Sequence, residues 1–376
     1  MDYDLLIKGG EVVDPGQALR GVMDVAIQGE CIAAIAPGID ASRAARVIDA
    51  SGKLVTPGLI DLHTHVGWGF SSLSVDPDVE AAKGAVCTQC DAGTLDAGAL
   101  PGLRRYLIDR TGSRVFAFLR IPWQARRWDQ PQDPRNVLQS HRGAAEVAIE
   151  ANRDVIIGLK AYLGWNVAGP ATEANLDYAR EVADLLGLPI MVHISTQPPD
   201  IDWVVSRLKE GDILSHCFTG HDQRVVDMYG KLRPAVKDAR ERGVLLDVGH
   251  GSGSFSFQVA RAMLDQGEPP DSISTDLHTG CVNGPTYSLV TTMNKFLALG
   301  MRLEDVVVRV TANPAKVIGR VEGLGALQVG GVADVSILRY EEGEFDLVDC
   351  HRVRQALGRG LVPDSAICRG KVLGEA

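Results

Sequence analysis

Residues 56–69 read TPGLIDLHTHVGWG, a Pro-Gly turn followed by an apolar run that ends in His63 and His65. This stretch opens a series of eight similar apolar runs through the middle of the chain. The runs cover residues 59–65, 85–91, 115–121, 155–162, 189–195, 212–217, 244–250 and 272–277. Short, nearly continuous apolar runs are typical of strands that are buried on both faces of a parallel sheet.

Helical patterns separate most of these strands. Residues 173–187, EANLDYAREVADLLG, carry apolar side chains at positions i, i+3, i+4 and i+7. Residues 284–300 and 302–319, after the eighth strand, also have a helical pattern. Eight strands that alternate with helices favour an α/β fold of the (β/α)8 or TIM barrel type over an open sheet.

The two ends of the chain have a different pattern. Short runs of Val, Ile and Ala alternate there with polar residues, and each run ends at Gly or Pro. This pattern is typical of strands, and the termini of a domain often lie close together. We therefore predict a small composite β-sandwich domain built from residues 1–55 and 322–376, with the barrel over residues 56–321.

The bulk composition excludes several classes of protein. The chain has 376 residues, 45% of them hydrophobic and 23% charged, which is ordinary for a globular protein. Its net charge of −10, without a Lys/Arg-rich run, argues against nucleic acid and acidic membranes as partners. The N-terminus resembles no secretory signal, and the seven scattered cysteines fit a reducing compartment, so we expect a cytoplasmic protein. The close pair Cys87 and Cys90 is interpreted as packing.

Potential metal ligands follow the predicted strands. In a (β/α)8 barrel, functional side chains lie at the C-terminal ends of the strands. Strand one ends in His63 and His65, strand four carries Lys160, strand five His193, strand six His216 and strand eight Asp276. Imidazoles and a carboxylate are ligands that Zn²⁺ prefers. One histidine at a strand end is often only a packed or rim residue, but four histidines and an aspartate on one rim predict a metal site.

Lys160 is the unusual member of this set. An ammonium group beside two cations would be repelled, and it has no lone pair to donate. A neutral amine could bind one ion, and the carbamate that it forms with CO₂ could bridge two. The alternative is a lysine whose stem packs at the strand end while its amine reaches solvent.

Further polar residues near the strand ends are candidates for binding a substrate. Arg120 ends strand three, and its planar guanidinium suits a carboxylate, although a solvated arginine fits the pattern as well. The loop beyond it carries Trp123, Arg126, Arg127 and Trp128. His250 and His278 could each hydrogen-bond a substrate or orient a metal ligand. Tyr162 and Trp68 fit packing as well as contact. No role is expected for His141, His221 and His351, which lie away from the strand ends.

The order and spacing of these motifs resemble the amidohydrolase superfamily. The motifs are PGLIDLHTH, GLK, MVHIS, LSHC and STD, and the resemblance covers nearly the whole chain. The segments SHCFTG, DVGHGSGSFSF and STDLHTG further resemble its amidohydrolase/deacetylase branch, a dihydroorotase-like group of metallohydrolases.

The resemblance implies a binuclear centre of two divalent ions, with Zn²⁺ favoured. Its ligands would be His63, His65 and Asp276 for the buried ion, His193 and His216 for the exposed ion, and N6-carboxylated Lys160 bridging both with a hydroxide. Asp276 would accept the proton of the hydroxide as general base and return it to the leaving group as general acid.

The implied reaction is hydrolysis of an acyl group, most simply acetyl, from an amide or ester of a small carboxylate. N-acetyl amino acids and O-acetyl α-hydroxy acids are such substrates. Arg120, His250 and His278 are the expected substrate contacts. The expected partner is therefore this small molecule, without nucleic acid or membrane, and self-association into a homo-oligomer is left open.

Cyclic amidohydrolases such as dihydroorotases and hydantoinases are the main alternative. Dihydroorotases commonly place an arginine just after the strand-one histidines, where this chain has Gly67 and Trp68. Deaminases of the superfamily usually have different surroundings at strands five and eight. A non-catalytic scaffold would have lost ligands, whereas all six positions are filled, and a purely structural zinc site would be closed and Cys-rich.

Overall fold

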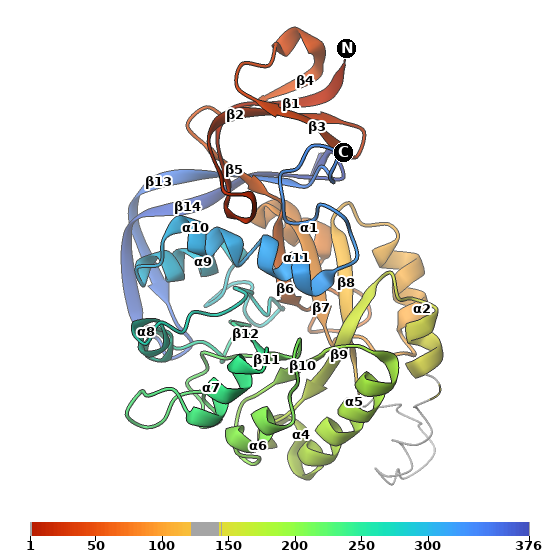
Figure 1. Cartoon of the computed structure of the whole chain (residues 1–376), viewed down its shortest axis with the longest axis vertical. Helices are drawn as coiled ribbons and strands as arrows, with labels where there is room; N and C mark the ends of the chain where they lie inside the picture. The colour runs from red at the N-terminus through yellow and green to blue at the C-terminus, as the bar shows by residue number, and fades with distance from the viewer. Residues whose placement is uncertain (1, 122–142, 144, 376) are drawn as a thin grey trace.

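The computed structural model describes residues 2–121, 143 and 145–375. Within them, a curled parallel sheet contains seven strands in the order β12-β11-β10-β9-β8-β7-β6 (Figure 1). The strands are β6 (Leu59–Thr64), β7 (Val86–Ala92), β8 (Arg114–Arg120), β9 (Ile156–Tyr162), β10 (Ile190–His193), β11 (Ile213–Ser215) and β12 (Leu245–Asp247). They coincide with the first seven predicted strands, so the predicted barrel-type fold is confirmed.

The eighth predicted strand, residues 272–277, is not a regular strand. It forms one parallel bridge at each end, from Ser272 to Asp247 and from Leu277 to Thr64. These bridges join it to β12 and to β6, the two edges of the sheet. Asp276 interrupts the extended backbone because its φ is +49°, in the left-handed region. The segment therefore fills the eighth position as an irregular connection rather than as the regular strand that we predicted.

Helices surround the sheet. They are α1 (Pro77–Gly84), α2 (Leu100–Leu103), α4 (Trp165–Ala168), α5 (Thr172–Leu186), α6 (Ile201–Ser206), α7 (Pro234–Glu241), α8 (Phe257–Asp265), α9 (Leu289–Ala298), α10 (Leu303–Val308) and α11 (Ala312–Ile318). Further short helical segments are η1 (Pro15–Gln17), η2 (Ala41–Arg43), η3 (Arg104–Ile108) and η4 (Gly169–Ala171). The predicted helix 173–187 corresponds to α5. The predicted helix 302–319 is instead two helices, since Pro314 cannot continue a helix begun by α10.

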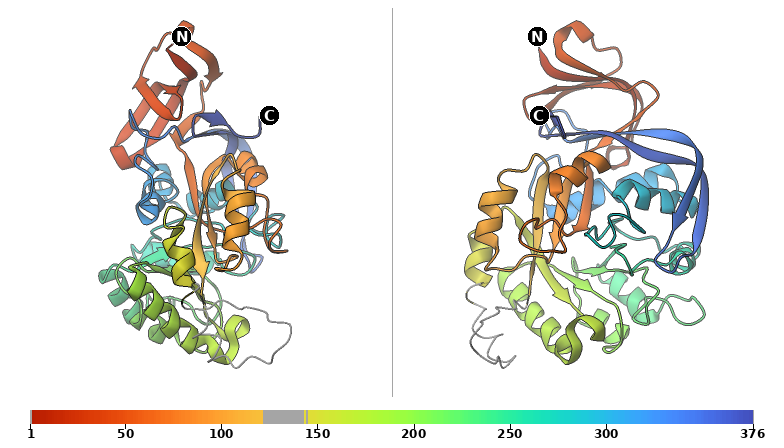
Figure 2. Two further views of the ribbon diagram at one scale, coloured as in Figure 1. Left: turned by 90° about the vertical axis from the view of Figure 1, so that its right-hand side faces the viewer. Right: turned by 180° about the vertical axis from the view of Figure 1, so that it is seen from behind.

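Strands from both ends of the chain form one mixed sheet, so both termini contribute to the same sheet as predicted (Figure 2). Its order is β15-β14-β13-β5-β1-β2-β3, and β4 pairs with β1. The strands are β1 (Tyr3–Asp14), β2 (Leu19–Gln28), β3 (Cys31–Ala36), β4 (Ala44–Asp49), β5 (Leu54–Pro57), β13 (Val335–Val348), β14 (Arg354–Cys368) and β15 (Lys371–Val372). Ile7, Val55 and Ile337, from the two chain ends, share one fully buried apolar cluster.

The β13–β14 hairpin extends from this sheet along the barrel (Figure 2). At its tip, Asp349 accepts a hydrogen bond from the backbone N–H of Phe257 (2.9 Å). Cys350 N–H donates to the carbonyl of Phe255 (3.1 Å). The domain boundaries at residues 55/56 and 321/322 stay a prediction. None of the described helices is both long enough and apolar enough to cross a membrane.

Candidate metal centre

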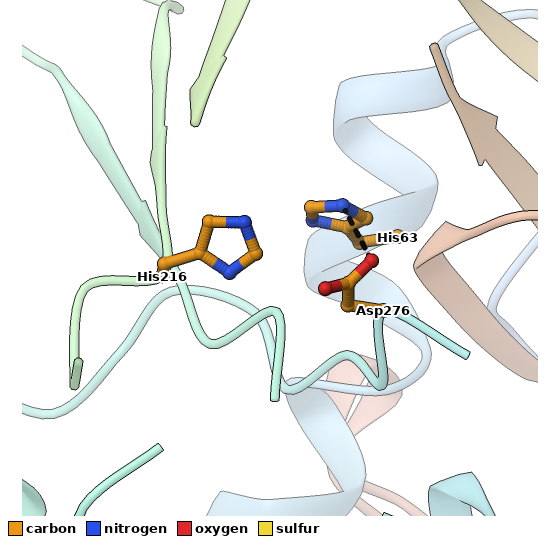
Figure 3. A group of neighbouring side chains, drawn as sticks. All are labelled: His63, His216 and Asp276. Carbon is orange, nitrogen blue, oxygen red and sulfur yellow. Dashed lines mark ion pairs between the residues drawn. The ribbon is translucent and has the colours of Figure 1, made fainter. Parts of the chain in front are cut away.

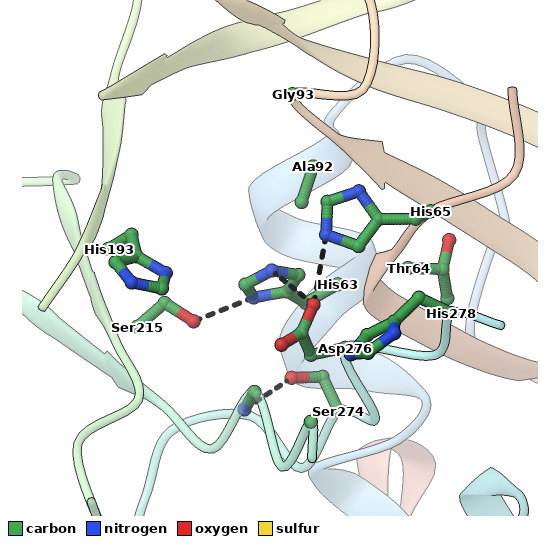
Figure 4. Close-up of polar contacts among 12 residues, drawn as sticks. His63, Thr64, His65, Ala92, Gly93, His193, Ser215, Ser274, Asp276 and His278 are labelled. Carbon is green, nitrogen blue, oxygen red and sulfur yellow. Dashed lines mark hydrogen bonds and ion pairs between the residues drawn. The ribbon is translucent and has the colours of Figure 1, made fainter. Parts of the chain in front are cut away.

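The six predicted ligands come together at the C-terminal ends of the barrel strands. Figure 4 shows His63, His65, His193 and Asp276. Five of them, His63, His65, Lys160, His216 and Asp276, are buried, and His193 is partly buried. Such a concentration of polar groups in the interior calls for partners, since an unpaired buried polar group is costly.

His193 and His216 face each other through ring nitrogens. His216 Nδ1 lies 2.6 Å from the carbonyl oxygen of Gly249. A carbonyl only accepts, so neutral His216 carries its hydrogen on Nδ1 and a lone pair on Nε2. That Nε2 lies 2.7 Å from Nδ1 of His193, while His193 Nε2 is buried without a hydrogen-bond partner. Because Nε2 of His216 carries a lone pair, the neutral ring of His193 donates to it from Nδ1.

Asp276 joins the two histidines of β6 and its extension. Its Oδ1 lies 3.3 Å from Nε2 of His63 and 3.0 Å from Nε2 of His65. The opposite nitrogen of His65 is held by Thr94 Oγ1 at 2.7 Å. His63, His216 and Asp276 each offer a ligand atom, and these atoms lie within 4.8 Å of one another (Figure 3). This group could hold a metal ion.

Lys160 completes the group. Its Nζ lies 3.1 Å from Nε2 of His63, and the side chain is fully buried. Burial lowers the pKa of Lys160 to about 8, which makes the neutral amine more accessible. A Cβ atom on Gly93 would lie 2.5 Å from Cγ of Lys160, so the lysine can occupy this place only beside glycine.

The protonation states of His193, His216 and Asp276 match those of metal ligands. Burial lowers the pKa of His193 well below its usual value and that of His216 to about 3. Burial alone would raise the pKa of Asp276, but His63 and His65 hold it well below its usual value. Neutral imidazoles and an ionised carboxylate are the forms that bind metals.

The backbone is strained at two of these positions. His216 has a φ of +65° and Asp276 a φ of +49°, a region that residues other than glycine rarely adopt. Such conformations cost about 1–3 kcal/mol each and cluster at functional sites. This strain is an indication of function that is independent of the residue types.

Arg120 and His278 lie at the same rim. The Cζ atom of Arg120 lies 5.0 Å above the ring of Tyr162, and that ring lies 5.5 Å from the ring of His193. The rings of His278 and His65 are 6.1 Å apart. His278 Nδ1 accepts from the backbone N–H of Gly280 (3.0 Å), so Nε2 carries the hydrogen of the neutral ring.

His250 has a different environment. It is fully buried, and its Nε2 lies 2.6 Å from Nζ of Lys295. Its Nδ1 lies 2.9 Å from the carbonyl of Gly251 and 3.0 Å from Oγ1 of Thr286. Both ring nitrogens are therefore engaged by the protein.

The sequence interpretation missed several residues of the site. Asp247 lies behind His63, with Oδ2 3.3 Å from Nδ1 of that ring. Its position at the end of β12 was a signal that could have identified it. Lys295, in the middle of α9, has no such signal.

The remaining aromatic and charged candidates from the sequence are not among the described residues of the buried group. Trp68 is 57% exposed. Trp123, Arg126, Arg127, Trp128 and His141 lie outside the described residues.

Comparisons with known proteins agree with this geometry. The model of the amidohydrolase family matches residues 54–373. A deacetylase of Agrobacterium fabrum is 34% identical over 88% of this chain and 80% of its own length. A deacetylase of Enterococcus faecalis is 31% identical over 99% of both chains.

Solved structures are similar along the whole chain as well. The crystal structure of an adenine deaminase has a TM-score of 0.89 at 31% identity and covers 99% of both chains. That of a dihydroorotase has a TM-score of 0.87 at 30% identity and covers 98% of this chain and 97% of its own. Together with the buried histidines and aspartate, these matches establish that the chain belongs to the amidohydrolase family of hydrolases.

Proposed function

We propose that the protein is a metal-dependent deacylase that removes an acyl group, most simply acetyl, from an amide or ester of a small carboxylate. The observation that carries this proposal is the pair of facing nitrogens of His193 and His216, 2.7 Å apart beside the group formed by His63 and Asp276. The similarity to two deacetylases over most of the chain supports the choice of reaction.

The residues fit two divalent ions, and their imidazole and carboxylate donors favour Zn²⁺. The ligands would be His63, His65 and Asp276 for one ion, His193 and His216 for the other, and N6-carboxylated Lys160 for both. Bound divalent ions would lower the pKa of a water molecule and polarise the acyl carbonyl.

Asp276 would move the proton. Its contacts with His63 and His65 both use Oδ1. Oδ2 is then the oxygen that accepts a proton from the attacking water and passes it to the leaving amine or alkoxide. The low pKa of Asp276 keeps this carboxylate ionised before the reaction begins.

Arg120 would bind the carboxylate of the substrate, because its guanidinium lies over Tyr162 beside His193. His278 would donate a hydrogen bond through Nε2. His250 would instead hold the loop after β12, because its ring is engaged by Lys295 and Gly251 and is not free to contact the substrate.

A cyclic amidohydrolase is the second candidate. The dihydroorotase structure, 30% identical along nearly the whole chain, favours it. The sequence after the strand-one histidines counts against it, since Gly67 and Trp68 stand where dihydroorotases commonly have an arginine. Because the chain is also similar to an adenine deaminase, deamination of adenine should be tested as well.

A panel of substrates tests the proposal. It comprises N-acetyl-D- and N-acetyl-L-amino acids, O-acetyl α-hydroxy acids, dihydroorotate, a hydantoin and adenine, each incubated with metal-replete protein. We expect release of acetate from at least one acetylated carboxylate. Turnover of a cyclic substrate or of adenine, with all acetylated compounds inert, would contradict the proposal.

Arg120→Met refines the same test. It should raise KM at least about tenfold with a smaller change in kcat, because a charge-assisted contact to the carboxylate is lost. The partly buried Arg153→Met, which removes a pair with Glu150 and a hydrogen bond to the carbonyl of Leu186, is the control away from the site and should leave KM unchanged.

A further inference from the structure

A buried polar cluster lies behind the metal centre. Its centre is Asp247, the last residue of β12, which is fully buried. Asp247 Oδ1 accepts hydrogen bonds from Ser272 and Ser274, each at 2.6 Å. Its Oδ2 accepts one from Ser215, also at 2.6 Å. An ionised carboxylate only accepts, so all three serine hydroxyls point their hydrogens at it.

The first arm of this cluster leads to His63. Ser215 Oγ lies 2.7 Å from Nδ1 of His63 (Figure 4). Because the single hydrogen of Ser215 is directed at Asp247, its oxygen has to accept from His63, and Nδ1 carries the ring hydrogen. The lone pair of His63 is then on Nε2, which faces Asp276 Oδ1 at 3.3 Å.

The second arm leads to His216. Ser274 gives its hydrogen to Asp247 and accepts one from the backbone N–H of Gly249 (2.9 Å). The carbonyl of the same Gly249 holds Nδ1 of His216 at 2.6 Å. One carboxylate therefore sets the orientation of a histidine on each side of the centre.

We propose that Asp247 is a positioning residue that fixes His63 as its Nδ1–H tautomer through Ser215 and orients His216 through Ser274 and Gly249. In this way it sets the metal affinity of both halves of the centre. The role in metal binding rests on the proposed function, whereas the tautomer of His63 does not. His65 differs, because its partner Thr94 is a hydroxyl that can donate or accept.

Asp247→Asn tests the inference. An amide in place of the carboxylate can donate to Ser215, which then donates to His63 and moves the ring hydrogen to Nε2. In metal-free protein, ¹⁵N NMR of the histidine rings, recorded at a pH high enough to keep His63 neutral, should show His63 change from the Nδ1–H to the Nε2–H tautomer. The affinity for added Co²⁺ should fall about 10- to 100-fold.

Asp212→Asn is the matched control. Asp212 is also buried and accepts from the backbone N–H of Ile190 (2.8 Å), but it lies at the start of the strands rather than at their ends. This variant should be destabilised with neither the tautomer nor the Co²⁺ affinity altered. If Asp247→Asn keeps both the tautomer and the affinity of the parent, the inference is wrong.

If Asp247→Asn does not fold, Ser274→Ala tests whether the cluster around Asp247 orients His216. It should shift the ¹⁵N signals of His216 and weaken one Co²⁺ site while His63 stays unchanged. Unchanged ¹⁵N signals of His216 would show that Ser274 and Gly249 do not orient this histidine. A parent protein that binds no Co²⁺ would contradict the proposed function, and the metal-free NMR spectra would still decide the role of Asp247.

Discussion

Lys295 is fully buried and faces His250, Cys350 and Asp349. Burial lowers its pKa from 10.5 to about 7. Between these values the unfolded chain binds more protons than the folded chain, so this group makes stability rise with pH. The contribution is at most about 1.4 kcal/mol per pH unit.

Lys295→Met should therefore lose part of this pH dependence. Urea unfolding at pH 7, 8 and 9 should show the stability of the parent rising relative to that of the variant. The exposed Lys237→Met is the control and should keep the slope of the parent. Parallel slopes for the parent and Lys295→Met would show that the lysine stays protonated in the folded protein.

Gly249 is the residue where the site tolerates least change. Its φ is +46°, and a Cβ atom would lie 2.6 Å from Ser215 Oγ and 2.9 Å from His63 Nδ1. Gly249→Ala should lower metal affinity about tenfold or more, because it displaces the group that orients His63. In Gly253→Ala, the added Cβ meets only His221, at 3.5 Å, and metal affinity should be unchanged. Equal metal affinities of Gly249→Ala and Gly253→Ala would show that a Cβ atom at residue 249 does not disturb the site.

The gathering of these polar residue types could be predicted from the sequence because the ends of neighbouring strands meet at one rim. The hydrogen-bond partners of these residues could not. Asp247 reaches Ser215 and Ser272 from other elements, and Lys295 meets His250 across 45 residues of sequence. Such contacts depend on the register between elements, which no local pattern specifies.

At the scale of elements, the segment 272–277 closes the barrel through side chains as well as backbone. Thr275 Oγ1 donates to Asp61 Oδ2 (2.6 Å) and accepts from the backbone N–H of Leu277 (2.9 Å). Thr275→Val keeps the shape of the side chain and removes both bonds. We expect a loss of about 1–3 kcal/mol in the free energy of unfolding, measured with urea.

Thr292→Val is the matched control for this closure. Thr292 is also buried, but its hydroxyl only donates to the carbonyl of Ser288, one turn back in α9 (3.1 Å). Thr292→Val should therefore lower the free energy of unfolding less than Thr275→Val does. A smaller cost for Thr275→Val would mean that Asp61 does not hold the closing segment.

Helices and strands could be predicted accurately from the sequence where hydrophobic periodicity determines the structure. The prediction failed where a single residue determines it. The seven regular strands and α5 follow the apolar pattern closely. The eighth strand was wrong because of the left-handed φ of Asp276, and the helix 302–319 because of Pro314. Both exceptions lie in the last part of the barrel.

At the scale of the whole molecule, Asn294 connects the barrel to the composite sheet. From α9, its side chain donates to the carbonyl of Leu361 and accepts from the N–H of Leu361, each at 2.8 Å. Asn294→Ala would leave both backbone groups buried without these partners, at about 1–3 kcal/mol each. Denaturant unfolding should show this loss as a shift of one cooperative transition.

Asn313→Ala is the control, because Asn313 makes a single bond to the backbone of Asp271 (2.9 Å) and is only half-buried. Its stability loss should be smaller. Two separate transitions in the parent protein would show instead that the barrel and the composite sheet unfold independently.

We propose that one set of residues holds two metal ions: His63, His65, His193, His216, Asp276 and carboxylated Lys160. The most direct test is the metal content of purified protein, measured by elemental mass spectrometry after expression with ample Zn²⁺. We expect about two ions per chain. One ion or none per chain under these conditions would contradict it.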